Sequence, residues 1–454
     1  MISRWMDSLR RSVFSRLLSK EGRFYFRTVF LVLAINGGSK VVGFAREVYI
    51  SGLYGVSRVT DAFFAVQQIP LFVQNYMFGA FNLVFIPGYA HAKQERFARA
   101  FLTALLRVLV SVGLVLTVLM LAGAYEWVPQ IVGVAGVAGD LAGDFAMILA
   151  LSILPIVLLG VSYGMLHAER QHVKAMLMEL ALPFVMFLSL IGLYLIRVND
   201  SYVLPWSFVI GALVAGGCAV YLMRRLVRDA PVSPPQTHRA QGPYLRGFFK
   251  QLSASSTENV GFNVNQLLNV YFAGTTGAGS IAVYAYTTRL ATFTLNGIVS
   301  PLNQMIQAWL SNNEPSERRG LHFAFIALAM LLLVLLIALL LIAFREPVVR
   351  LVYERGAFSA HDTARVAQTL VPYAVYFVVI ALKQLYARYF FVISRGGAYT
   401  LLSLVGYVIS NMLKPFLATS MGLSGVIWAC VIGEGVTLLF LIVQFLREEG
   451  LAPW

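Results

Sequence analysis

Residues 36–81 read NGGSKVVGFAREVYISGLYGVSRVTDAFFAVQQIPLFVQNYMFGAF. Most of this stretch is apolar enough to cross a bilayer, yet it contains Lys40, Arg46, Glu47 and Asp61. An ionised side chain near the bilayer centre costs about 2.5–3.5 kcal/mol on insertion scales, so such residues usually face a cavity and handle a charged solute. The stretch therefore predicts a membrane protein and a first candidate site.

The composition extends this prediction to the whole chain. Of its 454 residues, 59% are hydrophobic and 12% are charged, and the mean hydropathy of +0.74 exceeds that of soluble domains of this length. The net charge of +14 does not indicate nucleic acid as a partner, because Lys and Arg fall in short loops between apolar runs, as the positive-inside rule expects. Cys218 and Cys430 each lie inside an apolar run and are interpreted as small interior residues.

Residues 1–27 combine seven basic side chains with apolar side chains that are often three or four positions apart. This pattern is typical of a basic amphipathic helix on an anionic membrane surface, which makes membrane lipids a partner. A disordered basic tail is the alternative. Either reading places the N-terminus in the cytoplasm.

A membrane span needs about 20 apolar residues, and on that basis the chain contains about twelve spans. They are expected near 28–50, 61–89, 100–124, 141–166, 175–196, 203–223, 252–274, 280–310, 321–344, 367–391, 398–419 and 423–446. An even number of spans returns the C-terminal tail, residues 447–454, to the cytoplasm. Residues 345–366 are expected to form a short amphipathic helix at the outer interface.

The longest hydrophilic stretch, residues 224–250, follows the sixth span and contains four prolines. Polar, proline-rich segments between packed units are typical of linkers. The chain is therefore predicted to form an N-terminal six-helix lobe, 28–223, and a C-terminal six-helix lobe, 251–446. Duplicated transporters of this kind bind their substrate at the interface between the repeats.

The first span offers two cations to such an interface. Lys40 and Glu47 are seven residues apart and share a helix face, whereas Arg46 points about 120° away in a regular helix. A bend at the glycines of the span, among them Gly43, would bring both cations to one cavity, where they suit a phosphate or pyrophosphate group. Alternatively, Arg46 and Glu47 extend to the membrane surface.

The seventh span is unusually polar. Polar side chains cover two adjacent faces of this helix, with Ser255, Asn259 and Gln266 on one face and Glu258, Asn265 and Asn269 on the next; Asn263 adds to the set. A polar face cannot contact lipid without a large desolvation cost, so it is expected to line a hydrated path. Hydrogen bonding between helices is the alternative.

Further charges lie in the second lobe. Arg289 would face the cations of the first lobe, while Lys383, Lys414 and Glu434 have a coupling or a structural role, with Lys414 and Glu434 as a structural ion pair. No nucleophile motif, P-loop or metal-ligand spacing is present, so the sequence predicts neither an enzyme nor a metal site nor a cofactor. Uphill transport would then use an H⁺ or Na⁺ gradient, the membrane potential or consumption of the product.

The first two spans resemble the lipid II flippase (MurJ/MviN) family of the multidrug/oligosaccharidyl-lipid/polysaccharide exporter superfamily. The matching stretches are SKVVGFAREVYISGLYGVSRVTDAFFAVQQIP (39–70) and GAFNLVFIPGYA (79–90), with weaker matches at YAYTTRL (284–290) and LVYERGAFSAHDTARVAQTL (351–370). The resemblance implies two pseudo-symmetric six-helix lobes around a central cationic cavity. It also implies translocation of undecaprenyl-pyrophosphate-linked oligosaccharides, such as peptidoglycan precursors, across the bacterial inner membrane.

The resemblance also assigns roles to residues. Arg46 and Arg289 match cavity arginines of the family, Lys40 stands where the family usually has arginine, and Asp61 matches the acid before AFF. The resemblance therefore implies that Lys40, Arg46 and Arg289 bind the pyrophosphate. The other polar residues expected in the cavity are Asp61, Gln74, Asn75, Glu258, Asn259, Asn263 and Gln266, and Glu47 has a coupling or structural role.

The chain also departs from the family pattern. Gln74, Asn75 and Phe78 stand where an arginine pair and a glutamate are usual, and Thr288 replaces an acid before the second-lobe arginine. These differences favour a relative that moves an exopolysaccharide or O-antigen precursor rather than lipid II itself. Glycan-synthesis enzymes in the same membrane are further expected partners.

Two other functions stay open from the residues. A cation-coupled small-molecule or drug exporter of the same superfamily should prefer acidic cavity residues, and the basic set here argues against it. A membrane glycan polymerase would need acidic catalytic residues on its outer face, where the chain offers Glu354 and Asp362.

Overall fold

The computed structural model describes residues 20–134, 136–197, 200–229, 238–312 and 319–449. Within these ranges the regular structure is entirely helical. Each of the twelve predicted spans is matched by a helix or by a helix with a local break, so the predicted all-α fold is confirmed. Of the basic segment 1–27, only residues 20–27 lie in the described part, where they begin the first helix.

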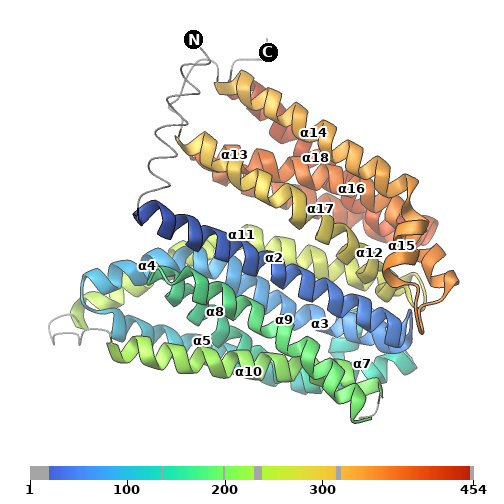
Figure 1. Ribbon diagram of the computed structural model, residues 1–454, viewed down its shortest axis with the longest axis horizontal. Helices are drawn as coiled ribbons and strands as arrows, with labels where there is room; N and C mark the ends of the chain where they lie inside the picture. The colour runs from blue at the N-terminus through green and yellow to red at the C-terminus, as the bar shows by residue number, and fades with distance from the viewer. Residues whose placement is uncertain (1–19, 135, 198–199, 230–237, 313–318, 450–454) are drawn as a thin grey trace.

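The N-terminal lobe forms the lower half of Figure 1. Its first helix is α2 (Lys20–Tyr54), and its second span consists of α3 (Arg58–Tyr76), the π-helical turn η1 (Met77–Phe81) and α4 (Asn82–Gln94). The others are α5 (Ala98–Ala122), the short α6 (Trp127–Ile131), α7 (Val137–Ala150), α8 (Ile153–Ala168), α9 (His172–Leu195) and α10 (Asp200–Asp229). Helices α7 and α8 together make one span that is bent by 43°.

The C-terminal lobe repeats this order. Its first helix is α11 (His238–Thr275), and its second span consists of α12 (Ser280–Thr294), the π-helical turn η3 (Leu295–Val299) and α13 (Ser300–Asn312). The others are α14 (Arg319–Ala343), α15 (Arg345–Tyr353), α16 (Ala360–Val392), α17 (Gly396–Met421) and α18 (Leu423–Glu448). A π-helical turn in the second span of both lobes fits the predicted duplication, and α15 is the short helix expected within 345–366.

Most spans in the described part of the chain are strongly apolar. In the described part of the chain, eight helices are long and apolar enough to cross a membrane, or nine when the bent pair counts as one span. Helices α2, α11 and α12 contain polar and charged residues, and all three contribute side chains to the cavity described below. These three helices therefore face the cavity.

The predicted linker is largely helical. Helix α10 continues to Asp229 and α11 begins at His238, so only part of residues 224–250 connects the lobes. The first turns of α11 pack on the N-terminal lobe, where the ring of Phe248 lies 5.4 Å from that of Phe101 and the hydroxyl of Tyr244 donates to the carbonyl of Gly88 at 2.8 Å. The predicted boundary at residue 251 falls inside α11.

Three hydrophobic cores hold the lobes. The largest joins both lobes at one end of the molecule, where the ring of Phe64 meets that of Tyr286 edge-on at 5.5 Å. A second core contains Phe323 and Phe445 and lies within the C-terminal lobe, while the third packs Phe85 of the N-terminal lobe with Phe248 of α11. Following the loop charges, we call the joined end the outer end and the opposite one the inner end. The lobes thus share the largest core at the outer end, whereas toward the inner end, among the described residues, only α11 of the C-terminal lobe joins a core of the N-terminal lobe.

Helix caps fix the segments at the outer end. Ser57 begins α3 with a capping box in which its hydroxyl accepts from the backbone N–H of Thr60. Ser359 begins α16 in the same way, with Asp362 as the reciprocal partner. Each such cap stabilises a helix start by about 1 kcal/mol. The cap at Ser57 also determines where Asp61, in the first turn of α3, lies relative to the other lobe.

Backbone contacts close the outer end. The N–H of Ala357 donates to the carbonyl of Gly52 at 2.8 Å, and the hydroxyl of Tyr286 donates to the carbonyl of Gly55 at 3.1 Å. Gly55 has a φ of +53°, and a Cβ at this position would lie 2.3 Å from the carbonyl oxygen of Ala357. A residue without a side chain is therefore needed here for two reasons: the left-handed backbone and the approach of the opposite lobe.

We expect Gly55→Ala to lower the melting temperature of the purified protein. The added methyl group forces the lobes apart, and overpacking of this kind costs about 1–3 kcal/mol. Gly38→Ala is the matched control, because a Cβ at Gly38 has no neighbour within 4 Å and alanine favours a helix interior. Thermal unfolding in detergent checks the prediction, and equal melting temperatures for the two variants would contradict it.

Candidate functional site

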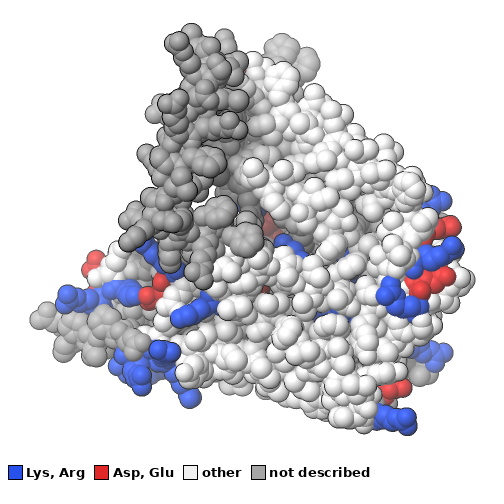
Figure 2. Space-filling model, in the orientation of Figure 1, with Lys and Arg blue, Asp and Glu red and all other residues white. Residues whose placement is uncertain are grey.

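A cavity of about 710 Å³ opens between the two lobes. Its walls come from α2 and α3 of the N-terminal lobe and from α11, α12, α16, α17 and α18 of the C-terminal lobe. Figure 2 shows charged atoms inside a hollow between the two halves of the described surface. The charged residues that line the cavity are Lys40, Arg46, Glu47, Glu258, Arg289, Lys383 and Glu434.

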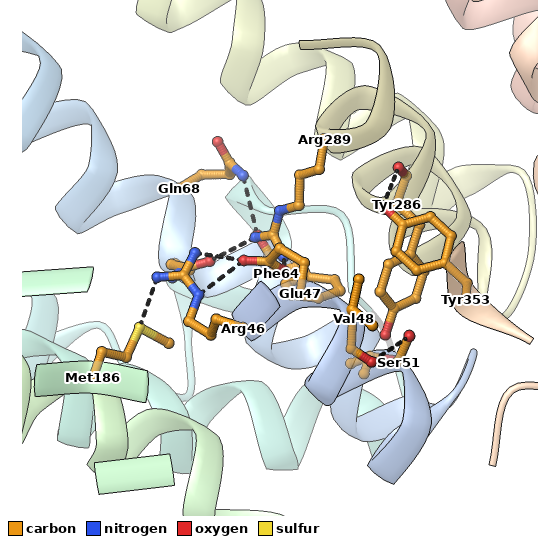
Figure 3. A network of polar contacts seen from close by, with 12 residues as sticks. Arg46, Glu47, Val48, Ser51, Phe64, Gln68, Met186, Tyr286, Arg289 and Tyr353 are labelled. Carbon is orange, nitrogen blue, oxygen red and sulfur yellow. Dashed lines mark hydrogen bonds and ion pairs between the residues drawn. The ribbon is translucent and has the colours of Figure 1, made fainter. Parts of the chain in front are cut away.

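Arg46, Glu47 and Arg289 form one ionic network at the cavity wall (Figure 3). The Nε of Arg46 donates to Oε1 of Glu47 at 3.0 Å, and its Nη2 pairs with the same oxygen. The Nη1 of Arg289 pairs with Oε2 of Glu47. Each carboxylate oxygen of Glu47 thus faces one arginine, one from α2 and the other from α12. The network therefore links the two lobes through a single buried carboxylate.

Neighbouring side chains hold both arginines in place. The guanidinium of Arg289 lies 4.1 Å above the centre of the Phe64 ring, and its Nη2 donates to Gln67 at 3.1 Å. The Nη1 of Arg46 lies 3.1 Å from the sulfur of Met186. Cation–π contacts of this kind contribute about 0.5–2 kcal/mol. Since the side chains of Arg46 and Arg289 keep 14% and 20% of their surface exposed, both are fixed but still reachable from the cavity.

Lys40 and Arg46 reach the same cavity without a break in their helix. Helix α2 runs continuously from Lys20 to Tyr54 through its glycines, and both cations line the cavity. The helix is therefore unbroken at the glycines, and the cavity accepts side chains from two of its faces. Lys40 has Glu179 of α9 as an electrostatic partner.

A second charged cluster lies on the C-terminal side of the cavity. The Nζ of Lys383 donates to Oε2 of Glu434 at 2.7 Å and lies 4.7 Å from the ring centre of Tyr407 and 5.6 Å from that of Tyr399. The hydroxyl of Tyr407 donates to Oε1 of Glu258 at 3.0 Å. Lys383 and Glu434 are both less than 4% exposed. The ion-pair partner of Glu434 is thus Lys383 and not, as predicted, Lys414.

Lys414 has a different environment. Its Nζ donates to the carbonyl and the side-chain oxygen of Asn265 at 3.3 and 2.8 Å, and to the side chain of Asn411 at 2.5 Å. It is fully buried and does not line the cavity. Hydrogen bonds to three oxygens satisfy a buried ammonium without a carboxylate. This arrangement gives Lys414 a structural role.

We expect Lys383→Met to lower the free energy of unfolding by about 3–5 kcal/mol, because it leaves Glu434 buried without its cation. The double variant with Glu434→Gln should regain part of this loss. Lys93→Met is the control, since Lys93 pairs with Glu169 at 2.5 Å at an exposed site, where such pairs contribute less than about 1 kcal/mol. Equal losses for Lys383→Met and Lys93→Met would contradict a buried ion pair.

The polar residues of α11 divide between two roles. Glu258, Asn263 and Gln266 line the cavity, and Asn263 accepts from the side chain of Asn75 of α3 at 3.1 Å. Asn265 instead holds Lys414, and Asn269 bonds to Tyr284 and receives a contact from Cys430. Polar side chains of α11 therefore line the cavity and also bond to other helices, and Glu258 lines the cavity although Asn265 and Asn269 on its face do not.

Three predicted cavity residues lie elsewhere. Gln74 and Asn259 are not part of the cavity wall; Asn259 instead bonds to Asn263 and packs against Gly79 of η1. Asp61 lies at the outer closure, where its carboxylate accepts from the backbone N–H of Gly279 at 2.5 Å and of Ala282 at 2.8 Å. These N–H groups are at the start of α12, and a helix N-terminus attracts a carboxylate.

Sequence reasoning missed the aromatic part of the cavity. Four tyrosines of α16 and α17 line it, namely Tyr373, Tyr376, Tyr399 and Tyr407. The signal was present, because tyrosine prefers a polar partner for its hydroxyl and is uncommon on a lipid-facing surface at mid-membrane depth. Among the described residues no group of three or more His, Cys, Asp or Glu side chains lies together as a metal site would require.

Comparison with known proteins agrees with this architecture. Residues 50–454 match the sequence model of the family described as "Lipid II flippase MurJ". The chain is 26% identical over 418 residues to the "Probable lipid II flippase MurJ" of Rhizobium meliloti (strain 1021), covering 89% of this chain and 77% of that protein. It is 24% identical over 441 residues to the "Lipid II flippase MurJ" of Burkholderia cenocepacia, covering 94% and 84%.

Solved structures share the fold. A lipid II flippase MurJ in an inward closed conformation superposes with a TM-score of 0.78 at 18% identity over 93% of this chain and 90% of that one. An inward-facing multidrug resistance MATE family transporter of the MOP superfamily gives a TM-score of 0.73 at 16% identity over 93% and 98%. Both likenesses establish the two-lobed helical fold. Since the family match spans nearly the whole chain, this multi-pass membrane protein belongs to the lipid II flippase MurJ family, whose members are transporters and not enzymes.

Proposed function

We propose that this chain moves undecaprenyl-pyrophosphate-linked saccharides, with lipid II as its cargo, from the inner to the outer leaflet of the bacterial inner membrane. One observation supports this most directly: the carboxylate of Glu47 is held between Arg46 of one lobe and Arg289 of the other inside the cavity. A pair of converging guanidinium groups is a binding site for an anion with several oxygens, and pyrophosphate is such an anion.

Charge balance favours the same cargo. The charged residues that line this side of the cavity are three cations, Lys40, Arg46 and Arg289, and one carboxylate, Glu47. Glu179, which does not line the cavity, adds one more carboxylate beside Lys40. The site is thus cationic overall, which matches a pyrophosphate with an ionised oxygen on each phosphate. Glu47 would hold the arginines together while the cavity is empty, and the pyrophosphate would take over its contacts on binding. The carboxylate then acts as an exchangeable partner, which avoids leaving two buried cations unpaired.

The rest of the cavity suits a saccharide. Asn75, Asn263 and Gln266 present amide groups, and the tyrosines of α16 and α17 present rings and hydroxyls. Sugar hydroxyls need such donors and acceptors once they leave water. The prenyl tail would remain in lipid between the lobes.

Movement would follow from alternating access. The lobes share the largest core at the outer end, and toward the inner end, among the described residues, only α11 of the C-terminal lobe joins a core of the N-terminal lobe. This arrangement is the one expected when cargo enters from the inside. Opening to the outside would break the contacts of Asp61 and Gly55 with the C-terminal lobe. The basic inner loops favour cytoplasmic termini, and an H⁺ or Na⁺ gradient or the membrane potential would drive the cycle. Enzymes that make the cargo in the same membrane are expected partners.

Complementation tests the choice of cargo. A bacterium depleted of its own lipid II flippase should grow when it expresses this chain and should not grow when it expresses the Arg46→Ala variant at the same level. If the true cargo is an exopolysaccharide or O-antigen precursor, the chain should fail to restore growth of the depleted strain. It should instead restore surface polysaccharide in a second strain that lacks its exopolysaccharide or O-antigen transporter. Efflux of organic cations without glycan movement would favour the exporter.

A further inference from the structure

The cavity has a second, acidic side. Glu258 and Glu434 line it together with one cation, Lys383. Two other cations of the C-terminal lobe are nearby but do not line it: Lys414 is enclosed by amide oxygens, and Arg388 bonds to Gln307 at 3.0 Å. The lining groups on this side therefore carry one more negative than positive charge. The groups that line the arginine side carry an excess of positive charge, so the two sides of the cavity are oppositely charged.

The acidic side has unused acceptor capacity. Glu434 is fully buried, and while its Oε2 pairs with Lys383, its Oε1 has no hydrogen-bond partner. A buried acceptor without a donor is costly and uncommon in folded proteins. Glu258 is only half-buried and faces the cavity, where Tyr407 donates to one of its oxygens. A hydrogen-bond donor that enters the cavity would therefore meet the carboxylate of Glu258 at the cavity surface, with the carboxylate of Glu434 behind it.

The surroundings of Lys383 indicate which donor fits. Its ammonium group lies against the rings of Tyr399 and Tyr407 and within hydrogen-bond distance of Glu434. Aromatic faces beside carboxylates are the usual environment of an ammonium group in proteins. The same two rings and Glu258 line the cavity beside it, so this side offers a second ammonium group the same chemistry.

We propose that Glu258, with Tyr399, Tyr407 and Glu434, forms a subsite for a primary ammonium group on the head group of the cargo. This inference rests on the proposed function, because it assigns the pyrophosphate to the arginine side and the amine to the opposite side of one cavity. The amine belongs either to an amino sugar or to an amino acid attached to the saccharide. An ion pair between this amine and Glu258 would orient the head group and select cargo by charge.

Matched cargoes test the subsite. Fluorescent undecaprenyl-pyrophosphate glycans are prepared in two pairs: a glycopeptide with a free or an acetylated lysine amine, and a saccharide with a free or an N-acetylated amino sugar. We expect the natural protein to bind the free-amine member of one pair about tenfold more tightly than its acetylated partner. A hydrogen bond between charged groups in a partly buried site should contribute an affinity difference of this size. The pair that shows the preference identifies the source of the amine.

The Glu258→Gln variant supplies the second readout. Its ratio of affinities for the free-amine and acetylated cargo should fall to about one, while Glu346→Gln, at an exposed position of α15, should keep the ratio of the natural protein. Tyr407→Phe removes the hydroxyl that holds Glu258 and should also lower this ratio of affinities. It replaces Glu258→Gln in the experiment if that variant does not fold.

The outcomes separate two failures. Equal affinity of the natural protein for both members of both pairs, or a Glu258→Gln variant that keeps the preference, would overturn the amine subsite and leave the flippase proposal standing. A natural protein that translocates none of the four cargoes would overturn the proposed function. Export of a simple organic cation that depends on Glu258, without glycan movement, would overturn both.

Discussion

Replacing Arg289 by alanine is expected to reduce translocation of a pyrophosphate-linked lipid at least about 30-fold, because truncating one partner of a buried, hydrogen-bonded charge pair costs about 2–5 kcal/mol. The change removes the contact with Glu47, the hydrogen bond to Gln67 and the stacking on Phe64. It also leaves Glu47 with only one arginine, so the two lobes lose their ionic link inside the cavity.

Arg289→Lys separates charge from geometry. Lysine keeps the positive charge but lacks the planar fork that contacts two oxygens at once, so its translocation rate should lie between those of the natural protein and the alanine variant. Arg350→Ala is the control, since Arg350 pairs with Glu354 at an exposed site on α15. Rates are measured in liposomes with a fluorescent lipid, with melting temperatures recorded in parallel. A normal rate for Arg289→Ala would contradict a role of this residue in binding.

Asp61→Asn is expected to have the second largest effect, by opening the outer end. The carboxylate of Asp61 accepts two backbone N–H groups at the start of α12, and charged hydrogen bonds contribute about 1.5–3 kcal/mol each. An amide loses the charge and part of this acceptor capacity. A loss of about 3 kcal/mol would shift the equilibrium between the closed and open outer end by roughly a hundredfold.

Spin labels at Glu126, just before α6, and at Glu346 of α15 measure this equilibrium, because both residues are exposed and lie at the outer end of opposite lobes. Double electron–electron resonance should show a longer distance for Asp61→Asn than for the natural protein, after replacement of the exposed Cys218. Asp140→Asn is the matched control, because Asp140 is an exposed aspartate in the first turn of α7. Identical distance distributions in all three proteins would contradict the assignment of Asp61 to the outer closure.

Local sequence signals predicted the helices and several cavity residues. Apolar runs of span length identify helices because lipid leaves the backbone no other way to satisfy its hydrogen bonds. Charges such as Lys40, Arg46 and Arg289 were expected in the cavity because their cost in lipid is high. The polar α11 was likewise expected to face the cavity, and three of its seven named polar residues line it, namely Glu258, Asn263 and Gln266.

Pairing between distant residues was not predictable. Glu47 and Arg289 are 242 positions apart, and nothing in either span shows that they meet. For the same reason Glu434 was assigned to Lys414, although Lys383 is its partner. Asp61 was expected in the cavity because it is a charge in an apolar stretch and matches the family's acid before AFF, whereas the turn at Gly55 carries it to the outer closure. Such contacts depend on how the lobes pack, which periodicity within one helix does not encode.

Leaflet translocation of an undecaprenyl-pyrophosphate glycan tests the central claim most directly. Liposomes contain the purified protein and a fluorescent glycan lipid in both leaflets, and a membrane-impermeant reductant then quenches the dye that is outside. With the natural protein we predict quenching of nearly all the dye, and with Arg46→Ala quenching of the outer half only. Quenching of only half the dye by the natural protein, or of nearly all by Arg46→Ala, would contradict a flippase that works through its arginine pair.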